Sequence, residues 1–123
     1  MFDFEKLDLY QVIREQNTKV FKFILEHSNI DPFILDQWKN ASLNIVLNLA
    51  EGTGRMVNTE KKNFITTARG SVFEAVAILD IAYHLGFVDD DTQHDFYEGY
   101  EKISKMLLGM IRSYSQQEGR SDK

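Results

Sequence analysis

Few residues of the chain have the types and the spacing that catalytic or metal chemistry requires. Four-helix proteins that bind two metal ions use Glu-x-x-His pairs together with further glutamates, and this sequence has no Glu-x-x-His. The nearest spacings are Asp91-x-x-His94 and Asp80-x-x-x-His84. Both fall at or near expected helix ends rather than in a buried seam, so we expect surface side chains, no metal site and no cofactor.

Other catalytic patterns are equally weak. The acidic run Asp89–Asp91 lacks the ligand spacing of a calcium-binding loop, and helix capping explains it more simply. Gly52-x-Gly54-Arg55 is too short for a phosphate loop, and no Gly-Lys-Ser/Thr follows it. Neither a Ser-His-Asp set nor a buried carboxylate pair can be assembled. We therefore predict that the protein is not an enzyme.

One dense basic group stands out: Arg55, Lys61, Lys62 and Arg69. These cations could contact the phosphates of RNA or DNA, or they could be the solvated start of a helix. The net charge of −5 argues against general polyanion binding, which depends on clustered Lys and Arg. Both interpretations stay open.

Glu51 and Arg69 form a second candidate pair. Glu51 follows a strongly apolar run, and Arg69 lies among small residues. An ion pair or a carbonyl contact that ties the corner to the bundle is the structural interpretation. A ligand contact at the corner is the functional one.

Length and composition limit the setting in which this chemistry could operate. At 123 residues the chain is expected to be one domain. It has no cysteine, which excludes disulfides and thiolate metal sites and favours a reducing cytoplasm. The N-terminus has acidic residues where a signal peptide would be basic, and no apolar run approaches the ~20 residues that span a bilayer. We expect a cytoplasmic protein with no membrane association.

Helical periodicity runs through the whole chain. The predicted helices are Leu7–His27, Pro32–Ala50, Glu60–Leu85 and one from the Asp89–Asp91 run to about residue 115. Short connections join them, and residues 116–123 read as a polar, frayed tail. The sequence therefore predicts an all-α, up-down-up-down antiparallel four-helix bundle over residues 1–115.

The run Ala41–Ala50 is apolar on nearly every face, and a helix of that kind must be covered all round. Glu51, Gly52 and Gly54 then form a predicted structural corner, where the glycines supply positive φ and end the helix. The core seam expected along this second helix is made of Ile34, Trp38, Ala41, Ile45 and Leu49.

Three residues punctuate the next predicted helix. Thr59 is a suitable N-cap, and Gly86 is a suitable C-cap glycine. Gly70 costs about 1 kcal/mol relative to alanine in a helix interior, so we expect it to mark a tight crossing.

More apolar residues are present than one small bundle needs. Some lie behind the seam of the second helix and others off the seam of the fourth. The predicted oligomer interface is Leu43, Val46, Leu47, Ala50, Leu108 and Ile111. Because exposed apolar patches usually mark interfaces, we expect a homo-oligomer, for which a dimer is the default.

Three segments carry a family resemblance: FEKLDLYQ at Phe4–Gln11, NIVLNLAEGTGR at Asn44–Arg55, and ARGSVFEAVAILDIAYHLGFV at Ala68–Val88. Together they resemble the small four-helix-bundle proteins encoded within intervening sequences of bacterial 23S rRNA genes. The middle segment of that family typically reads S-I-P-x-N-I-A-E-G, followed by a glycine and basic residues. The family proline is Val46 here. The matching residues are Asn48, Ala50, Glu51, Gly52, Gly54 and Arg55.

That family is similar to accessory proteins of diversity-generating retroelements, which are pentameric four-helix bundles that bind nucleic acid and a reverse transcriptase. The resemblance implies a cytoplasmic bacterial bundle that forms a ring, with a pentamer preferred over a dimer. The first functional hypothesis is a non-catalytic oligomeric interaction module that acts on a protein or a ribonucleoprotein. The alternative is a nucleic-acid-binding accessory protein that uses the basic corner.

Overall fold

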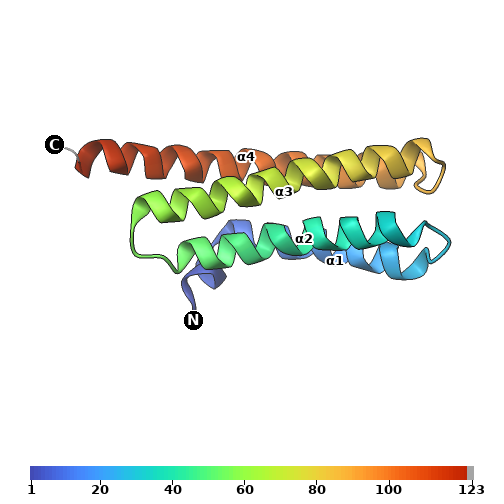
Figure 1. Ribbon diagram of the computed structural model, residues 1–123, viewed down its shortest axis with the longest axis horizontal. Coiled ribbons are helices and arrows are strands. Elements are labelled where there is room, and N and C mark those ends of the chain that lie inside the picture. Colours follow the sequence, from blue (N-terminus) through green and yellow to red (C-terminus); the bar gives the residue numbers. More distant parts are fainter. Residues whose placement is uncertain (122–123) are drawn as a thin grey trace.

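Four long helices make up the computed structural model, which describes residues 1–121. After a short 3-10 helix η1 (Asp3–Lys6), the chain forms α1 (Asp8–Glu26), α2 (Pro32–Thr53), α3 (Asn58–His84) and α4 (Asp90–Ser121). Successive helices run in opposite directions, and the first residues lie at the same end as the close of α4 (Figure 1). No strand occurs in the described part, and the predicted all-α four-helix fold is confirmed.

Aspartate caps fix where two of the helices begin. The Asp31 carboxylate accepts from the backbone N–H groups of Phe33 (2.9 Å) and Ile34 (3.3 Å), and Pro32 takes the first helical position. Asp89, directly before α4, accepts from the Thr92 N–H at 2.7 Å. Hydrogen bonding to Thr92 lowers the pKa of Asp89. Capping therefore accounts for the acidic start of α4.

A glycine ends α3 as predicted, while the start of that helix differs. Gly86 has φ +84°, and the N–H of Phe87 reaches back to the carbonyl of Ala82 (3.0 Å). This is the six-residue bond of a Schellman motif, which needs the left-handed conformation that glycine adopts readily. At the other end, the N-cap position is Val57 rather than Thr59, and no side chain caps the helix there.

The predicted glycine corner is wrong in its mechanism. Helix α2 continues past Ala50 to Thr53, so Gly52 lies inside it, and Gly54 has φ −82°. A Cβ on Gly52 would lie 2.8 Å from Phe64 Cβ on α3. Gly52 therefore allows two helices to approach closely instead of ending one.

Gly70 was expected at a tight crossing, and this expectation is also wrong. A Cβ there would meet nothing within 4 Å, and the residue is exposed.

Helix α4 extends farther than expected. It remains helical to Ser121 and projects beyond the start of α3 (Figure 1). The predicted frayed tail, 116–123, is thus helical as far as Ser121, and its last two residues lie outside the described ones.

A single apolar core joins the helices. Ile45, Leu79 and Leu107, on three different helices, are fully buried in it. In the α2 seam Leu35 is buried, whereas Ile34 is only half-buried. Helix α3 packs extensively on α2 and α4, while α1 makes fewer contacts. Small buried residues on α3 allow this close packing: Ala68, Ser71, Ala75 and Ala82.

Buried amides attach α1 to its two neighbours. Gln16 Nε2 donates to the carbonyl of Phe96 on α4, and Asn17 Nδ2 donates to the carbonyl of Ser42 on α2, each at 2.8 Å. Because these partners are backbone groups on different helices, the two bonds fix the position of α1. Direct polar contact thus complements the thinner apolar packing of this helix.

An indole–phenol pair lies in the core between α2 and α4. Trp38 Nε1 donates to the Tyr100 hydroxyl at 3.0 Å. Burial raises the pKa of Tyr100 to about 12, although hydrogen bonding to Trp38 opposes the shift. The phenol is therefore neutral at physiological pH.

Candidate functional site

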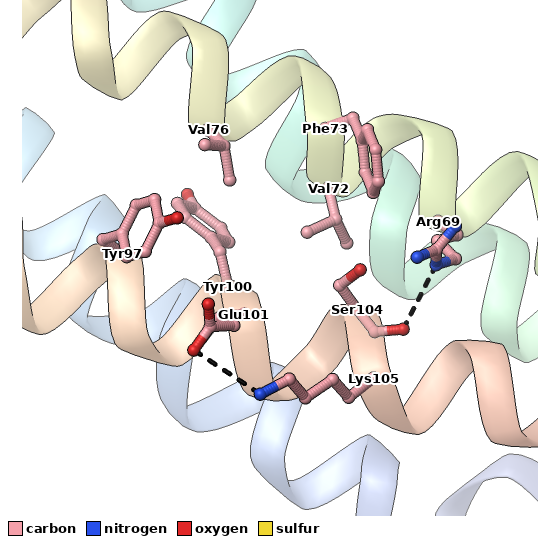
Figure 2. A pocket seen from close by; sticks show the side chains of 9 residues that line it. All are labelled: Arg69, Val72, Phe73, Val76, Tyr97, Tyr100, Glu101, Ser104 and Lys105. Carbon is pink, nitrogen blue, oxygen red and sulfur yellow. Dashed lines mark hydrogen bonds and ion pairs between the residues drawn. The ribbon is translucent and has the colours of Figure 1, made fainter.

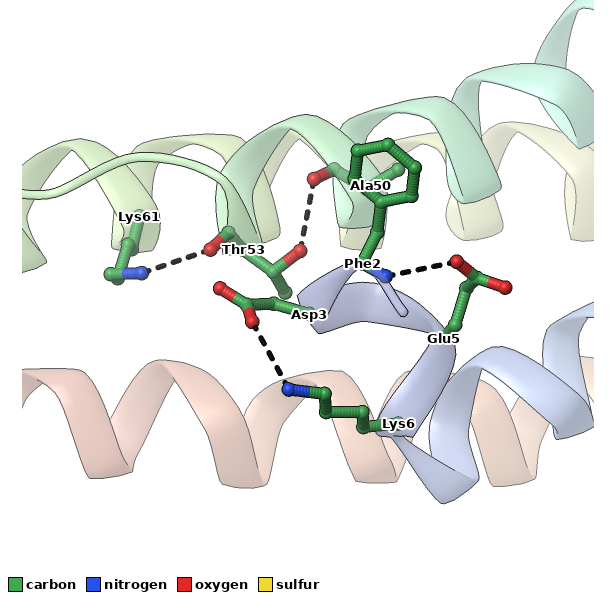
Figure 3. A network of polar contacts seen from close by, with 7 residues as sticks. All are labelled: Phe2, Asp3, Glu5, Lys6, Ala50, Thr53 and Lys61. Carbon is green, nitrogen blue, oxygen red and sulfur yellow. Dashed lines mark hydrogen bonds and ion pairs between the residues drawn. The ribbon is translucent and has the colours of Figure 1, made fainter.

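The basic corner is held together by contacts within the chain. Arg55 Nη2 pairs with Glu51 Oε1 at 2.8 Å, and its guanidinium lies 4.7 Å from the centre of the Phe64 ring. Lys61 Nζ donates to the carbonyl oxygen of Thr53 at 3.1 Å (Figure 3). This bond satisfies a carbonyl at the C-terminal end of α2 that has no partner within the helix. Two of the four predicted phosphate contacts are therefore engaged in closing the α2–α3 corner.

The other two cations lie further along α3. Lys62 is half-buried, and Arg69 lies about two turns beyond it. Arg69 Nε donates to the Ser104 carbonyl at 3.3 Å, and its guanidinium lies 4.9 Å from the Phe73 ring centre. Arg69 thus contacts α4 and lies away from the corner, so the four cations do not form one continuous site.

The Glu51–Arg69 pairing is also wrong. Glu51 pairs with Arg55 instead, four residues along the chain. Arg69 does make a carbonyl contact, but this contact ties α3 to α4 rather than to the corner.

The groove beside Arg69 was not predicted. It lies between α3 and α4, has a volume of about 350 Å³, and is drawn in Figure 2. Its lining residues are Arg69, Val72, Phe73, Val76, Tyr97, Tyr100, Glu101, Ser104 and Lys105. Phe73 and Tyr97 both lie off the predicted core seams. Two aromatic residues outside the seams were the signal in the sequence that could have indicated a groove.

The predicted oligomer residues fall on two separate surfaces. On α2, Leu43 is 45% exposed and Leu47 is 57% exposed, while Val46 and Ala50 are half-buried. These four lie on successive turns of the outward side of α2, and we call them the α2 outer face. In the described part of the chain the backbone of α2 lies beside those of α1 and α3, whereas α4 lies diagonally opposite and meets α2 through core side chains such as Tyr100.

On α4, Leu108 and Ile111 are half-buried, and Ile111 packs on the core. The two α4 residues therefore belong to a different side of the bundle from the α2 outer face.

Sequence reasoning missed another apolar surface. Phe33 is 71% exposed, and with Ile81 it borders a groove of about 210 Å³ between α2 and α3. Nearly all its lining side chains are apolar. Phe33 and Ile81 lie off the predicted core seams, which was the available sequence signal.

The two candidate metal spacings remain at the surface. His84 Nδ1 lies 3.4 Å from Asp80 Oδ1, and His94 Nε2 lies 3.0 Å from Glu98 Oε1. Through residue 121, as far as the structure describes the chain, no three His, Cys, Asp or Glu residues come together as a metal site.

None of the described helices is both long and apolar enough to cross a membrane.

Comparison with known proteins gives a family and a fold. A crystal structure from Bacteroides thetaiotaomicron, described as a protein of unknown function from the S23 ribosomal protein family, is similar over 84% of this chain and 97% of that one. The TM-score is 0.77 and the sequence identity 14%, so this likeness concerns the fold. No curated protein matches. Residues 5–109 match the family described as 23S rRNA-intervening sequence protein, and the chain belongs to that family.

Proposed function

We propose that the protein is a non-catalytic, self-associating interaction module that acts through the α2 outer face. The observation that carries this proposal is the exposure of Leu43 and Leu47, 45% and 57%, one turn apart on the same side of α2. Val46 and Ala50 extend the apolar surface beside them. A contiguous exposed apolar surface is typical of an interaction site.

Energetics favour covering this surface with protein. Full burial of one leucine side chain stabilises by about 1.5–3 kcal/mol. Ser42, next to Leu43 on the same helix, is buried and adds no polar group to this surface. A second copy of the chain is the simplest cover, because it is present whenever the protein is.

The number of copies follows from the resemblance rather than from the surface. A dimer is the default for homo-oligomers. The resemblance to pentameric bundles favours a closed ring, in which one face packs on a different face of the next copy. Such a ring would work in the cytoplasm as a platform for a protein or ribonucleoprotein partner.

The second candidate is nucleic-acid binding at the corner. The grouping of Arg55, Lys61 and Lys62 at one end of the bundle supports it, since a ring would repeat the charge. The internal contacts of Arg55 and Lys61 reduce what they can offer to phosphate. Binding of RNA or DNA should then weaken steeply with salt and be lost in a Lys61→Glu/Lys62→Glu variant.

Light scattering coupled to size exclusion tests the preferred function. We expect a mass near five times the 14.3 kDa of one chain at about tens of micromolar protein. A dimeric mass would contradict the ring alone. A monomeric mass would contradict self-association itself.

A further inference from the structure

The groove between α3 and α4 has a polar end and an apolar body. Figure 2 shows Arg69 at one end and Tyr97 at the other, with Val72 and Val76 between them. Arg69 and Val76 are seven residues apart, or about 10 Å along the helix. Its volume of about 350 Å³ is within the range of small-molecule sites, about 300–1,000 Å³.

The floor and walls of the groove suit an apolar group. Val72 and Tyr100 are buried and close the floor. Phe73 and Tyr97 stand on opposite helices and are 56% and 44% exposed, so an apolar ligand would gain contact with two aromatic rings. The Tyr100 hydroxyl already accepts from Trp38 in the core, so the phenol is held in place.

Arg69 is held in position by its own contacts. Its Nε–H donates to the Ser104 carbonyl, and the guanidinium carbon lies over the Phe73 ring. A guanidinium has five N–H donors, and Nε accounts for one. Within residues 1–117, the part whose side chains the structure describes, the four N–H groups on the two Nη atoms have no hydrogen-bond or ion-pair partner. They form an end-on fork of the geometry that binds a carboxylate with two hydrogen bonds.

The remaining charges give the ligand a direction. Glu101 and Lys105 lie on the α4 edge of the groove and pair with each other at 3.6 Å. The Glu101 carboxylate lies toward the Tyr97 end of the groove, and the Arg69 guanidinium lies at the opposite end (Figure 2). An anionic group is therefore attracted to the Arg69 end and repelled from the Tyr97 end.

We propose that the α3–α4 groove binds an elongated apolar carboxylate. The carboxylate accepts from the Nη groups of Arg69, and the apolar body lies over Val72 and Val76 toward Tyr97. The site shares no residue with the α2 outer face, so this proposal does not depend on self-association.

A matched pair of ligands tests the site: 4-phenylbutyrate and its neutral counterpart 4-phenylbutan-1-ol, titrated into the full-length protein and followed by calorimetry and amide NMR shifts. We expect the carboxylate to bind about tenfold more tightly than the alcohol, since a charge-assisted fork is the only difference. The largest shifts should fall on groove residues.

Three variants assign the effect. Arg69→Gln should abolish the preference for the carboxylate while changing alcohol affinity less than about twofold. Tyr97→Ala should weaken both ligands and keep their ratio. Arg14→Gln is the control, because the Arg14 guanidinium also lies over an aromatic ring of its own helix, 5.5 Å from the centre of Tyr10, but on α1. It should change neither affinity.

Three outcomes would overturn the proposal: equal affinity for the two ligands, a preference that survives in Arg69→Gln, or no shift of groove signals at about 10 mM ligand. If Arg69→Gln unfolds, the Tyr97→Ala result still decides, because loss of both affinities places the ligand body in the groove. Unchanged affinities there would place the ligand elsewhere. Self-association is measured separately by molar mass, so failure of either proposal is recognised independently.

Discussion

The α2 outer face and the basic corner, where α2 connects to α3, are neighbours in the chain, yet their side chains are in opposite situations. At the corner, Arg55 and Lys61 have partners inside the chain. On the outer face, Leu43 and Leu47 extend from the bundle with large exposed fractions. The cations of the basic corner thus make contacts within the chain, whereas the leucines of the α2 outer face are exposed to solvent.

This difference teaches that charge in a sequence does not measure the charge available for binding. A lysine that occupies a helix-end carbonyl, as Lys61 does with Thr53, must give up that contact to bind phosphate. An exposed leucine loses only water when a partner covers it. The comparison therefore favours apolar contact as the main function of this end of the molecule.

The largest effect should come from a charge on the α2 outer face. Leu47→Glu should convert the assembly to monomers, because a buried unpaired carboxylate at an apolar contact is costly. Helix content by circular dichroism should stay near wild type, since Leu47 is 57% exposed. Asn44→Glu is the matched control: it adds the same charge to an exposed site on α2 and should keep the assembly.

The next largest effect concerns the packing of α2 against α3 at the corner, and it is measured as protein stability. Gly52→Ala forces a Cβ to within 2.8 Å of Phe64 Cβ, whereas Gly70→Ala meets no atom within 4 Å. Both variants gain similar helix propensity. Denaturant unfolding should therefore show Gly52→Ala less stable than Gly70→Ala by about 1–3 kcal/mol. Equal stabilities would mean that close approach at Gly52 is not important.

Both surfaces rest on the same core, so a core change should alter stability without changing assembly. In the folded state the pKa of Tyr100 is about 12, compared with 10.0 when exposed. The unfolded chain therefore loses this proton first, and stability falls as pH rises from 10 to 12. Tyr100→Phe should flatten that decline and also cost about 1–3 kcal/mol at neutral pH, because Trp38 Nε1 loses its partner.

If the alkaline decline in unfolding free energy is the same in Tyr100→Phe, other groups cause it. The molar mass of the variant, measured under native conditions, should match the wild type.

The smallest effect is expected from the corner ion pair. Arg55→Ala removes an exposed pair with Glu51, four residues away, and should cost only about 0.3–0.5 kcal/mol. It should leave the molar mass unchanged. A change in assembly state would mean that the corner, rather than the α2 outer face, makes the contact between copies.

Helical periodicity predicted the fold because core burial repeats along each helix. Ile45, Leu79 and Leu107 could be placed in the core by spacing alone. The C-cap at Gly86 followed from local chemistry that involves only neighbouring residues. These parts of the structure depend on short-range rules, and a single sequence contains them.

The roles of the glycines and cations could not be predicted in the same way. Gly52 looked like a helix end, but its role depends on Phe64 of another helix. Arg69 reaches a carbonyl 35 residues away on α4, which no local pattern encodes. The exposed aromatic residues of the α3–α4 groove likewise became a site only when two helices were placed side by side.

Cysteine labelling compares the two surfaces directly, because the chain has no native cysteine. Leu47→Cys places a thiol on the α2 outer face, and Thr59→Cys places one at the exposed start of α3 beside the corner. In the assembled protein, maleimide should react with the cysteine of Thr59→Cys about as fast as with a cysteine in a free peptide. The cysteine of Leu47→Cys should react at least about tenfold more slowly, and this protection should be lost on dilution. Equal rates at both positions in a protein of oligomeric mass would contradict the account.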